Sequence, residues 1–190
     1  MFFFNQIRVG NDLISDMIEK VYIEYVILKS QEDKSFLEKL IQLIQPKILN
    51  YCQRQISHPQ LAQDAMQDTL LEVFSKIHKL KDHRRFHAWM YKVCHNKCID
   101  VLRKLKPEMN QQLIEKQEEY IASKDTLNSN AMDIHNVIKK LSAKHKTVIT
   151  LFYYEGFSVK EIAAILKTPA GTVKSDLFYA RGLIKDSLEK

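Results

Sequence analysis

The sequence predicts an all-α fold in which two small helical domains are joined by a flexible linker. Only four glycines and four prolines occur in 190 residues, which leaves few turn signals for the many short strands of a sandwich or barrel. Apolar residues recur at helical spacing on both sides of a central stretch rich in Gln, Glu, Asn and Ser. We therefore expect an N-terminal extension over 1–34, a first domain over 35–106, a linker over 107–131 and a second domain over 132–190.

Charge is distributed in blocks, within a formal net charge of +6. Residues 60–75 contain three acids and no Lys or Arg, whereas residues 76–106 contain ten Lys or Arg and two acids. An acidic block beside a basic one indicates two different partners, because a single polyanion would be repelled by the acidic surface.

The three cysteines, Cys52, Cys94 and Cys98, are too few for a disulfide framework and suit a reducing cytosol. The apolar run that begins at Phe2 stops at Asn5, far short of a signal peptide or a membrane span. We expect a cytoplasmic protein that needs no cofactor.

In the N-terminal part, an amphipathic helix is expected over 12–29, with an apolar stripe formed by Leu13, Met17, Val21, Tyr25 and Leu28. A second helix begins near Ser35, and Pro46 is expected to break or kink it before 48–56.

The segment 61–77 predicts a helix with one apolar face and one acidic face. Leu71 is the only large apolar residue on the acidic face. A basic loop over 78–85 follows, and then a helix that Pro107 is expected to end.

The C-terminal part predicts four helices, over 132–141, 143–154, 159–166 and 169–187. Ser142 can cap the second, Ser158 and Glu161 form a capping box, and Thr168 before Pro169 supplies an N-cap and a first-turn proline.

The last two helices, joined by a tight turn around 166–168, predict a helix-turn-helix. Its second helix would face base edges in a major groove, and Lys174 and Arg181 suit phosphate or guanine contacts. The residues that the packing pattern leaves for the exposed side are Thr172, Lys174, Ser175, Asp176, Phe178, Tyr179 and Arg181.

The segment EGFSVKEIAAILKTPAGTVKSDLFYARGLIK resembles region 4.2 of the extracytoplasmic-function sigma factors, and KKLSAKHKTVITLFYY resembles region 4.1. Independently, LAQDAMQDTLLEVFSKI resembles region 2.2, and FHAWMYKVCHNKCIDVLRK resembles regions 2.3 and 2.4. Two unrelated motifs in the family's order are stronger evidence than either alone. The resemblance implies a non-enzymatic transcription initiation factor that brings core RNA polymerase to promoters.

The resemblance also implies partners and site residues. The region 2.2 helix would bind the clamp coiled coil of the largest polymerase subunit through Asp64, Gln67, Asp68, Leu71 and Glu72. Single-stranded DNA of the −10 element would lie on Lys81, His83, Arg84, Arg85, Tyr91, Lys92, Asn96, Lys97, Arg103 and Lys104. Duplex DNA of the −35 element would lie on Thr168, Gly171, Thr172, Lys174, Ser175, Asp176, Phe178, Tyr179 and Arg181.

Further partners implied by the family are the polymerase flap and an anti-sigma factor that holds the protein at the membrane. Two aromatic residues of this segment, Trp89 and Tyr91, could stack on the −10 bases. The spacing of Trp89 with Phe86, Met90 and Val93 favours a core role, whereas Tyr91 lies off that stripe and is the better candidate for stacking on bases.

Two other classes of protein compete with this interpretation. Cys94, His95 and Cys98 could indicate a metal or redox enzyme, but two thiols and one ring do not complete a tetrahedral site. A helix-turn-helix regulator that works without polymerase would explain 132–190 and leave 61–106 without a role.

Overall fold

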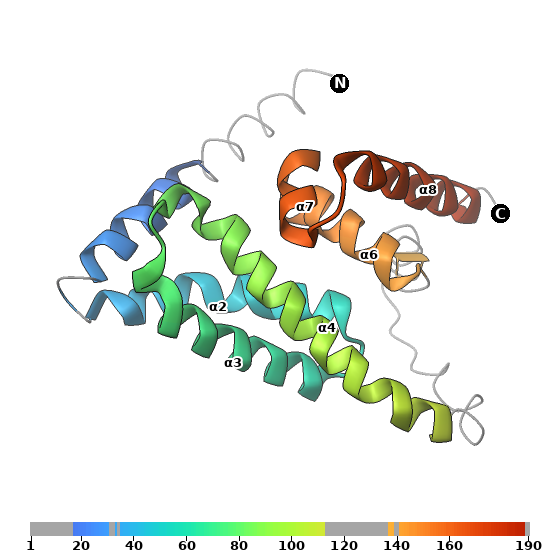
Figure 1. Cartoon of the computed structure of the whole chain (residues 1–190), viewed down its shortest axis with the longest axis horizontal. Helices are drawn as coiled ribbons and strands as arrows, with labels where there is room; N and C mark the ends of the chain where they lie inside the picture. Colours follow the sequence, from blue (N-terminus) through green and yellow to red (C-terminus); the bar gives the residue numbers. More distant parts are fainter. Residues whose placement is uncertain (1–16, 31–32, 34, 113–136, 139–140, 189–190) are drawn as a thin grey trace.

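The computed structural model of the chain describes residues 17–30, 33, 35–112, 137–138 and 141–188, with side chains described up to residue 104 in the first group of helices. Within these residues the fold is entirely helical, as predicted (Figure 1). The helices are residues 17–30, α2 (Ser35–Gln55), α3 (Pro59–Lys76), α4 (Phe86–Gln112), α6 (Ala143–Ile149), α7 (Val159–Leu166) and α8 (Ala170–Leu188). Shorter turns are η1 (Ile77–Lys79), η2 (His83–Arg85) and the π-helix η3 (Thr150–Tyr154).

The first group of helices is a bundle in which α2, α3 and α4 each pack against the other two. Its core includes the fully buried Leu40, Ile44, Ile48, Phe86 and Met90. These apolar residues recur along each helix at intervals of about one turn, and the bundle forms because burying that stripe removes it from water.

The helix end predicted at Pro107 is wrong, and of the break or kink predicted at Pro46 the break does not occur. Helix α2 runs unbroken through Pro46, and α4 continues through Pro107 to Gln112. A proline in a helix removes one backbone hydrogen bond, but its fixed φ is close to the helical value, and packing can hold the helix together. On α2 that packing comes from Ile44 and Ile48, which flank the proline and are both fully buried.

The predicted buried face of the N-terminal helix is also wrong. Met17, Val21, Tyr25 and Leu28 are exposed, and the helix instead packs into the core through Ile23, Val26 and Ile27. Leu13 lies outside the described residues. The helix carries large apolar residues on both faces, so periodicity alone could not decide which of them is buried.

In the second group, α6, α7 and α8 pack around η3, and two of the predicted caps are confirmed. The Ser142 hydroxyl accepts a hydrogen bond from the backbone N–H of His145, and Ser158 and Glu161 form the reciprocal capping box. The predicted cap at Thr168 is wrong: its hydroxyl donates to the carbonyl of Leu166, and α8 begins at Ala170. The predicted linker beyond residue 112 and most of the predicted helix 132–141 lie outside the described residues.

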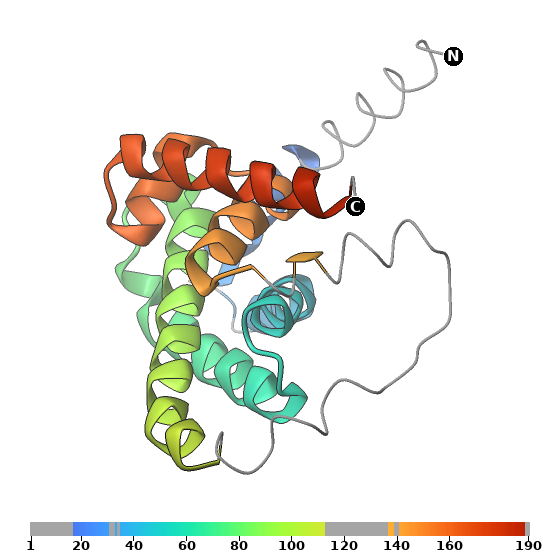
Figure 2. The ribbon, with the colours of Figure 1, turned by 90° about the vertical axis from the view of Figure 1, so that its right-hand side faces the viewer.

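The two groups contact each other, with α7 against α4 and α6 against α2. In both views α8 lies on the outer side of the second group, away from α3 (Figure 1 and Figure 2). None of the helices in the described part of the chain is long and apolar enough to cross a membrane.

Candidate nucleic-acid and polymerase interfaces

The outward side of α3 carries the predicted acidic surface, here called the α3 face: Asp64, Gln67, Asp68, Leu71 and Glu72. Its opposite side is buried through Ala62, Ala65, Met66, Thr69 and Val73, which fixes the rotation of the helix. Leu71 is 68% exposed in the midst of these polar residues. An exposed leucine ringed by charge is typical of a surface that another protein covers.

Glu72 is the member of the α3 face that differs most from the prediction. Its carboxylate is bound by Lys76 at 2.7 Å and by Lys97 of α4 at 2.8 Å. These two hydrogen bonds hold its pKa below the ordinary value. Much of its charge is therefore neutralised within the chain, so the net negative field of the α3 face comes mainly from Asp64 and Asp68.

Most of the predicted −10 residues form a cationic track on η2 and α4. The exposed members are Lys81, Arg84, Arg85, Asn96, Arg103 and Lys104, and the half-buried ones are His83, Lys92 and Lys97. The Nε atoms of Arg84 and Arg85 lie 3.0 Å and 3.4 Å from carboxylate oxygens of Asp82, which holds both side chains at the start of α4. A surface of this kind can follow the phosphates of a single strand.

At His83 and Tyr91 the structure departs from that track. The Nε2 atom of His83 is buried and has no hydrogen-bond partner within the described chain. Tyr91 is only 2% exposed. It therefore cannot stack on bases in this arrangement, because its ring is held edge-on between Tyr51 and Phe157.

Trp89 is half-buried and packs against the core, as its spacing predicts. Tyr91 lies two positions further along α4 and was expected to point outward. It points to the second group of helices instead, and the sequence of one domain cannot reveal a partner from the other.

The helix-turn-helix is built as expected by α7 and α8. Ile162 and Ile165 of α7 pack with Val173, Leu177 and Ala180 of α8, all of them buried. Between the helices Lys167 adopts the left-handed conformation, with φ 53°, which ends α7 and turns the chain sharply.

The exposed side of α8 carries Gly171, Lys174, Ser175, Phe178, Tyr179 and Arg181, with Thr168 and Thr172 half-buried at its start. Phe178 is 73% exposed, which makes it the most exposed large apolar residue of this surface. The guanidinium of Arg181 lies over the rings of Phe152 and Tyr153. A shallow groove of about 500 Å³ is lined by Phe152, Val159 and residues of α8.

Asp176 is the exception on α8, and its predicted place in the DNA-facing set is wrong. It is 6% exposed, and its carboxylate forms an ion pair with Lys144 of α6, with 2.8 Å between Oδ1 and the lysine Nζ atom. Its carboxylate therefore ties α8 to α6 and is turned away from solvent. This also removes the repulsion that an exposed acid would exert on phosphate.

A contact between the two groups, here called the interdomain contact, was not predicted. It joins Arg54, Gln55 and Tyr91 of the first group to Thr147, Thr150, Tyr154, Glu155 and Phe157 of the second. The Gln55 amide accepts from Thr147 at 2.9 Å and donates to Thr150 at 3.3 Å. No sequence signal marks these residues, because polar residues on helices usually face water.

Glu155 is the centre of the interdomain contact. Its carboxylate accepts a hydrogen bond from the Tyr91 hydroxyl and lies 3.7 Å from Arg54. Burial raises the pKa of Glu155, while Tyr91 and Arg54 act in the opposite direction. Burial also raises the pKa of Tyr91, so its hydroxyl stays protonated and serves as the donor.

An exposed recognition helix, held by the buried core of α7 and α8, defines a helix-turn-helix DNA-binding protein. Residues 40–108 match the family Sigma-70 region 2, and residues 131–184 match Sigma-70, region 4. The chain belongs to the extracytoplasmic-function group of RNA polymerase sigma factors. A polymerase-independent regulator would leave the region 2 match unexplained, and that alternative is set aside.

Known sigma factors are similar in sequence to this protein along most of the chain. The sigma factor SigV of Bacillus subtilis is 30% identical over 136 residues, which cover 68% of this chain and 76% of SigV. The extracytoplasmic-function sigma factor SigW of the same organism is 27% identical over 173 residues, covering 82% of this chain and 90% of SigW.

Solved structures agree in fold. The sigma factor RpoE of Bartonella quintana, solved with the anti-sigma factor NepR, aligns with a TM-score of 0.67 at 24% identity, over 80% of this chain and 96% of RpoE. CnrH, solved with the cytosolic domain of CnrY, aligns with a TM-score of 0.62 at 18% identity, over 87% of this chain and 96% of CnrH.

The chain is thus a sigma factor, not an enzyme: it directs RNA polymerase to promoters through regions 2 and 4. The first group of helices, which contains α2 to α4, corresponds to region 2, and the second group, which contains α6 to α8, corresponds to region 4.

Proposed function

We propose that this sigma factor binds core RNA polymerase through the α3 face, holds the opened −10 strand on the cationic track of η2 and α4, and reads the −35 duplex with α8. The observation that carries this proposal is that three surfaces of different chemistry lie on different helices. The acids with Leu71 lie on α3, most of the cations lie on α4, and the third surface is the exposed side of α8. The α3 face and the track meet where Glu72 binds Lys97.

Each surface has the chemistry that its assigned partner requires. The clamp coiled coil of polymerase, the partner implied by the family, would present basic residues to Asp64 and Asp68 and an apolar contact to Leu71. The opened strand needs cations along its phosphates, which the track supplies. Two weak DNA contacts that are joined through one polymerase give a higher combined affinity for DNA that carries both promoter elements.

The test is the affinity of the labelled protein for core RNA polymerase, measured by fluorescence anisotropy. Changing both Asp64→Lys and Asp68→Lys should weaken binding at least tenfold, which is about 1.4 kcal/mol. The matched control reverses two other exposed acids of region 2, Glu38→Lys and Asp100→Lys, and should bind as the wild type does. Equal losses in both variants would reject the α3 face, and a folded wild type that does not bind would reject the proposed mechanism.

We also propose that an anti-sigma factor controls the protein in the cytoplasm and holds it near the membrane when that inhibitor is membrane-bound. RpoE and CnrH, which share its fold, were each solved with an anti-sigma factor or part of one. Such an inhibitor would compete with polymerase for the α3 face or for region 4. An inhibitor that binds the chain without displacing core polymerase would contradict this.

A further inference from the structure

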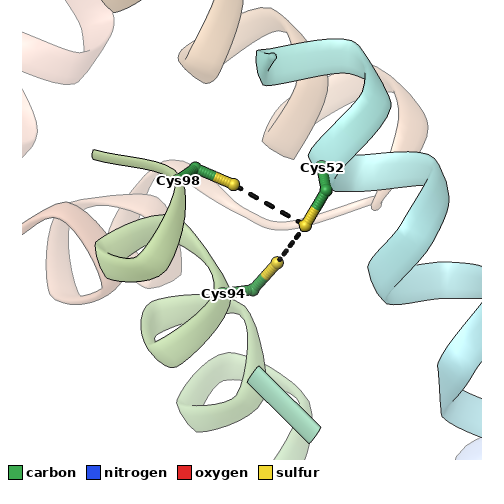
Figure 3. A group of neighbouring side chains, drawn as sticks. All are labelled: Cys52, Cys94 and Cys98. Atoms are coloured by element: carbon green, nitrogen blue, oxygen red, sulfur yellow. Dashed lines mark hydrogen bonds between the residues drawn. The ribbon is translucent and has the colours of Figure 1, made fainter. Parts of the chain in front are cut away.

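Region 2 contains a cluster of thiols that promoter recognition does not use. Cys52 projects from α2 toward Cys94 and Cys98, which lie one turn apart on α4 (Figure 3). The Cys52 sulfur is 3.5 Å from that of Cys94 and 3.7 Å from that of Cys98, and all three sulfurs lie within 4.8 Å of one another. All three side chains are at most 1% exposed. The cluster thus presents three sulfurs to a common point inside the bundle.

The donor set limits which ion could bind. Among the described residues no fourth histidine, cysteine or carboxylate joins the three sulfurs, so the tetrahedral protein site that structural zinc takes is not formed. His95, the nearest histidine in sequence, lies 3.2 Å from the Tyr51 hydroxyl through its Nδ1 atom. The site therefore suits a soft, three-coordinate ion.

The shortest sulfur separation fits a pyramidal ion better than a planar one. Three bonds of about 2.3 Å to one ion place the sulfurs about 4.0 Å apart in a plane, and about 3.4 Å apart when the ion rises out of it with angles near 95°. The shortest separation, 3.5 Å, is close to the pyramidal value, and the next, 3.7 Å, lies midway between the two values.

The net charge of the bound site further limits which ion could bind. Three thiolates around a monovalent or divalent ion leave a net negative charge in an apolar core, which is costly without a partner. Three thiolates around a trivalent ion leave none. A pyramidal trivalent ion with a strong preference for sulfur satisfies both the geometry and the charge.

We propose that Cys52, Cys94 and Cys98 bind one arsenic(III) ion, taken up as uncharged arsenous acid. Three As–O bonds break and three As–S bonds form. Each leaving hydroxyl takes one thiol proton and departs as water, so three waters are released and nothing is oxidised or reduced.

Binding would join α2 to α4 close to the interdomain contact. Gln55 follows Cys52 by three residues on α2 and holds Thr147 and Thr150 of region 4. The bound ion would therefore stabilise region 2 next to the place where region 4 docks. Since the sulfurs are buried, uptake requires α2 and α4 to part briefly and should be slow.

The experiment uses the full chain, reduced and free of oxygen, incubated with sodium arsenite, desalted and examined by native mass spectrometry. We expect one arsenic per chain, with a mass gain of one arsenic less three hydrogens. A chain that retains no arsenic, or one that loses only two hydrogens as a dithiol adduct would, overturns the proposal. So does a competition in which zinc(II) or copper(I) displaces equimolar arsenite.

Variants separate the loss of a ligand from a loosened core. Cys52→Ala, Cys94→Ala and Cys98→Ala should each retain arsenic at least tenfold less well. Val73→Ala, which removes buried atoms from α3 in the same bundle and leaves every thiol in place, should retain one arsenic as the wild type does. Equal losses in Val73→Ala and the cysteine variants would overturn the assignment. The hydrogen count on the wild type decides the question if a cysteine variant fails to fold.

Discussion

The α3 face and the interdomain contact are both surfaces of region 2, yet they are built differently. The α3 face exposes a leucine and two acids to water, whereas the interdomain contact buries a carboxylate, a phenol and an amide against polar groups of region 4. Polar pairs regain hydrogen bonds to water when they separate, so such a contact opens at lower cost than an apolar one. From this difference we expect the α3 face to bind a partner protein and the interdomain contact to be able to open.

Opening would have a direct consequence for the −10 site. Tyr91 lies on α4 among the cationic residues, with Tyr51 of region 2 on one side of its ring and Phe157 and Glu155 of region 4 on another. When region 4 moves away, the ring should become more exposed next to the track. A role of Tyr91 in stacking on −10 bases would then require the interdomain contact to open.

The largest effect should come from Glu155→Lys. The change places a cation against Arg54 and leaves the Tyr91 hydroxyl without its acceptor. Breaking this partly buried charged pair should cost about 2 kcal/mol or more. The interdomain contact should open, which a larger radius of gyration in small-angle X-ray scattering would reveal. Binding of single-stranded −10 DNA by the free protein should rise.

Glu155→Gln is the matched control, because the amide keeps the size and can still accept from Tyr91. Its scattering profile should match that of the wild type. If Glu155→Lys also stays compact, the polar contact does not hold the two regions together. The interdomain contact would then not be the surface that opens.

Leu71→Ala tests the other surface and should have the next largest effect. Burying a leucine is worth about 1.5–3 kcal/mol, so affinity for core polymerase should fall by about tenfold or more. The free energy of unfolding should change by no more than about 0.5 kcal/mol, because the side chain contributes little to the isolated chain. A large loss of stability without a loss of polymerase affinity would place Leu71 in the fold and not in the interface.

The α3 face could be predicted from the sequence because its exposed residues and the buried residues that orient the helix all lie on one helix. The spacing of Ala62, Met66 and Val73 assigns the buried side, and the acids follow on the other. The helix-turn-helix is a similar case, since its caps and its core lie within one stretch of chain. Two positions were mispredicted: Thr168 does not cap α8, and Asp176 is buried because its partner Lys144 lies on another helix.

Properties that depend on contacts between helices could not be predicted in this way. Helix α2 continues through Pro46 because of packing that a local rule does not include. The burial of Tyr91 depends on residues more than sixty positions away. The meeting of Cys52 with Cys94 and Cys98 likewise depends on how α2 lies against α4, and their spacing in sequence gives no sign of it.

Tyr91→Phe should loosen the interdomain contact without abolishing it. The ring still packs on Tyr51 and Phe157, and Glu155 keeps Arg54, so the cost should be about 1 kcal/mol for one lost hydrogen bond. The compact fraction measured by scattering should fall between those of the wild type and Glu155→Lys. A variant as open as Glu155→Lys would mean that the hydroxyl, and not the ion pair, dominates the contact.

The smallest effect should be a pH dependence of the compact fraction. Burial raises the pKa of Glu155 in the closed arrangement, whereas in the open one the carboxyl is hydrated and titrates near its ordinary value of about 4.3. The closed arrangement therefore binds the proton more tightly, and closing is favoured as pH falls. This contribution is complete below the ordinary value and is lost as pH rises through the raised one.

The groups that face Glu155 set the limits of this pH effect. Arg54 and Lys47 are the cations that act on Glu155, and the pKa of Tyr91 is raised, so its hydroxyl does not lose its proton in the acidic range. His95, whose pKa burial lowers, acts in the opposite direction within region 2, because its protonation opposes the buried state. Scattering measured from pH 4.5 to 7.5 should show more of the compact form at the acidic end, and Glu155→Gln should remove that trend while leaving the contribution of His95. A trend that survives in Glu155→Gln would assign the pH dependence to region 2 itself and leave the interdomain contact insensitive to protons.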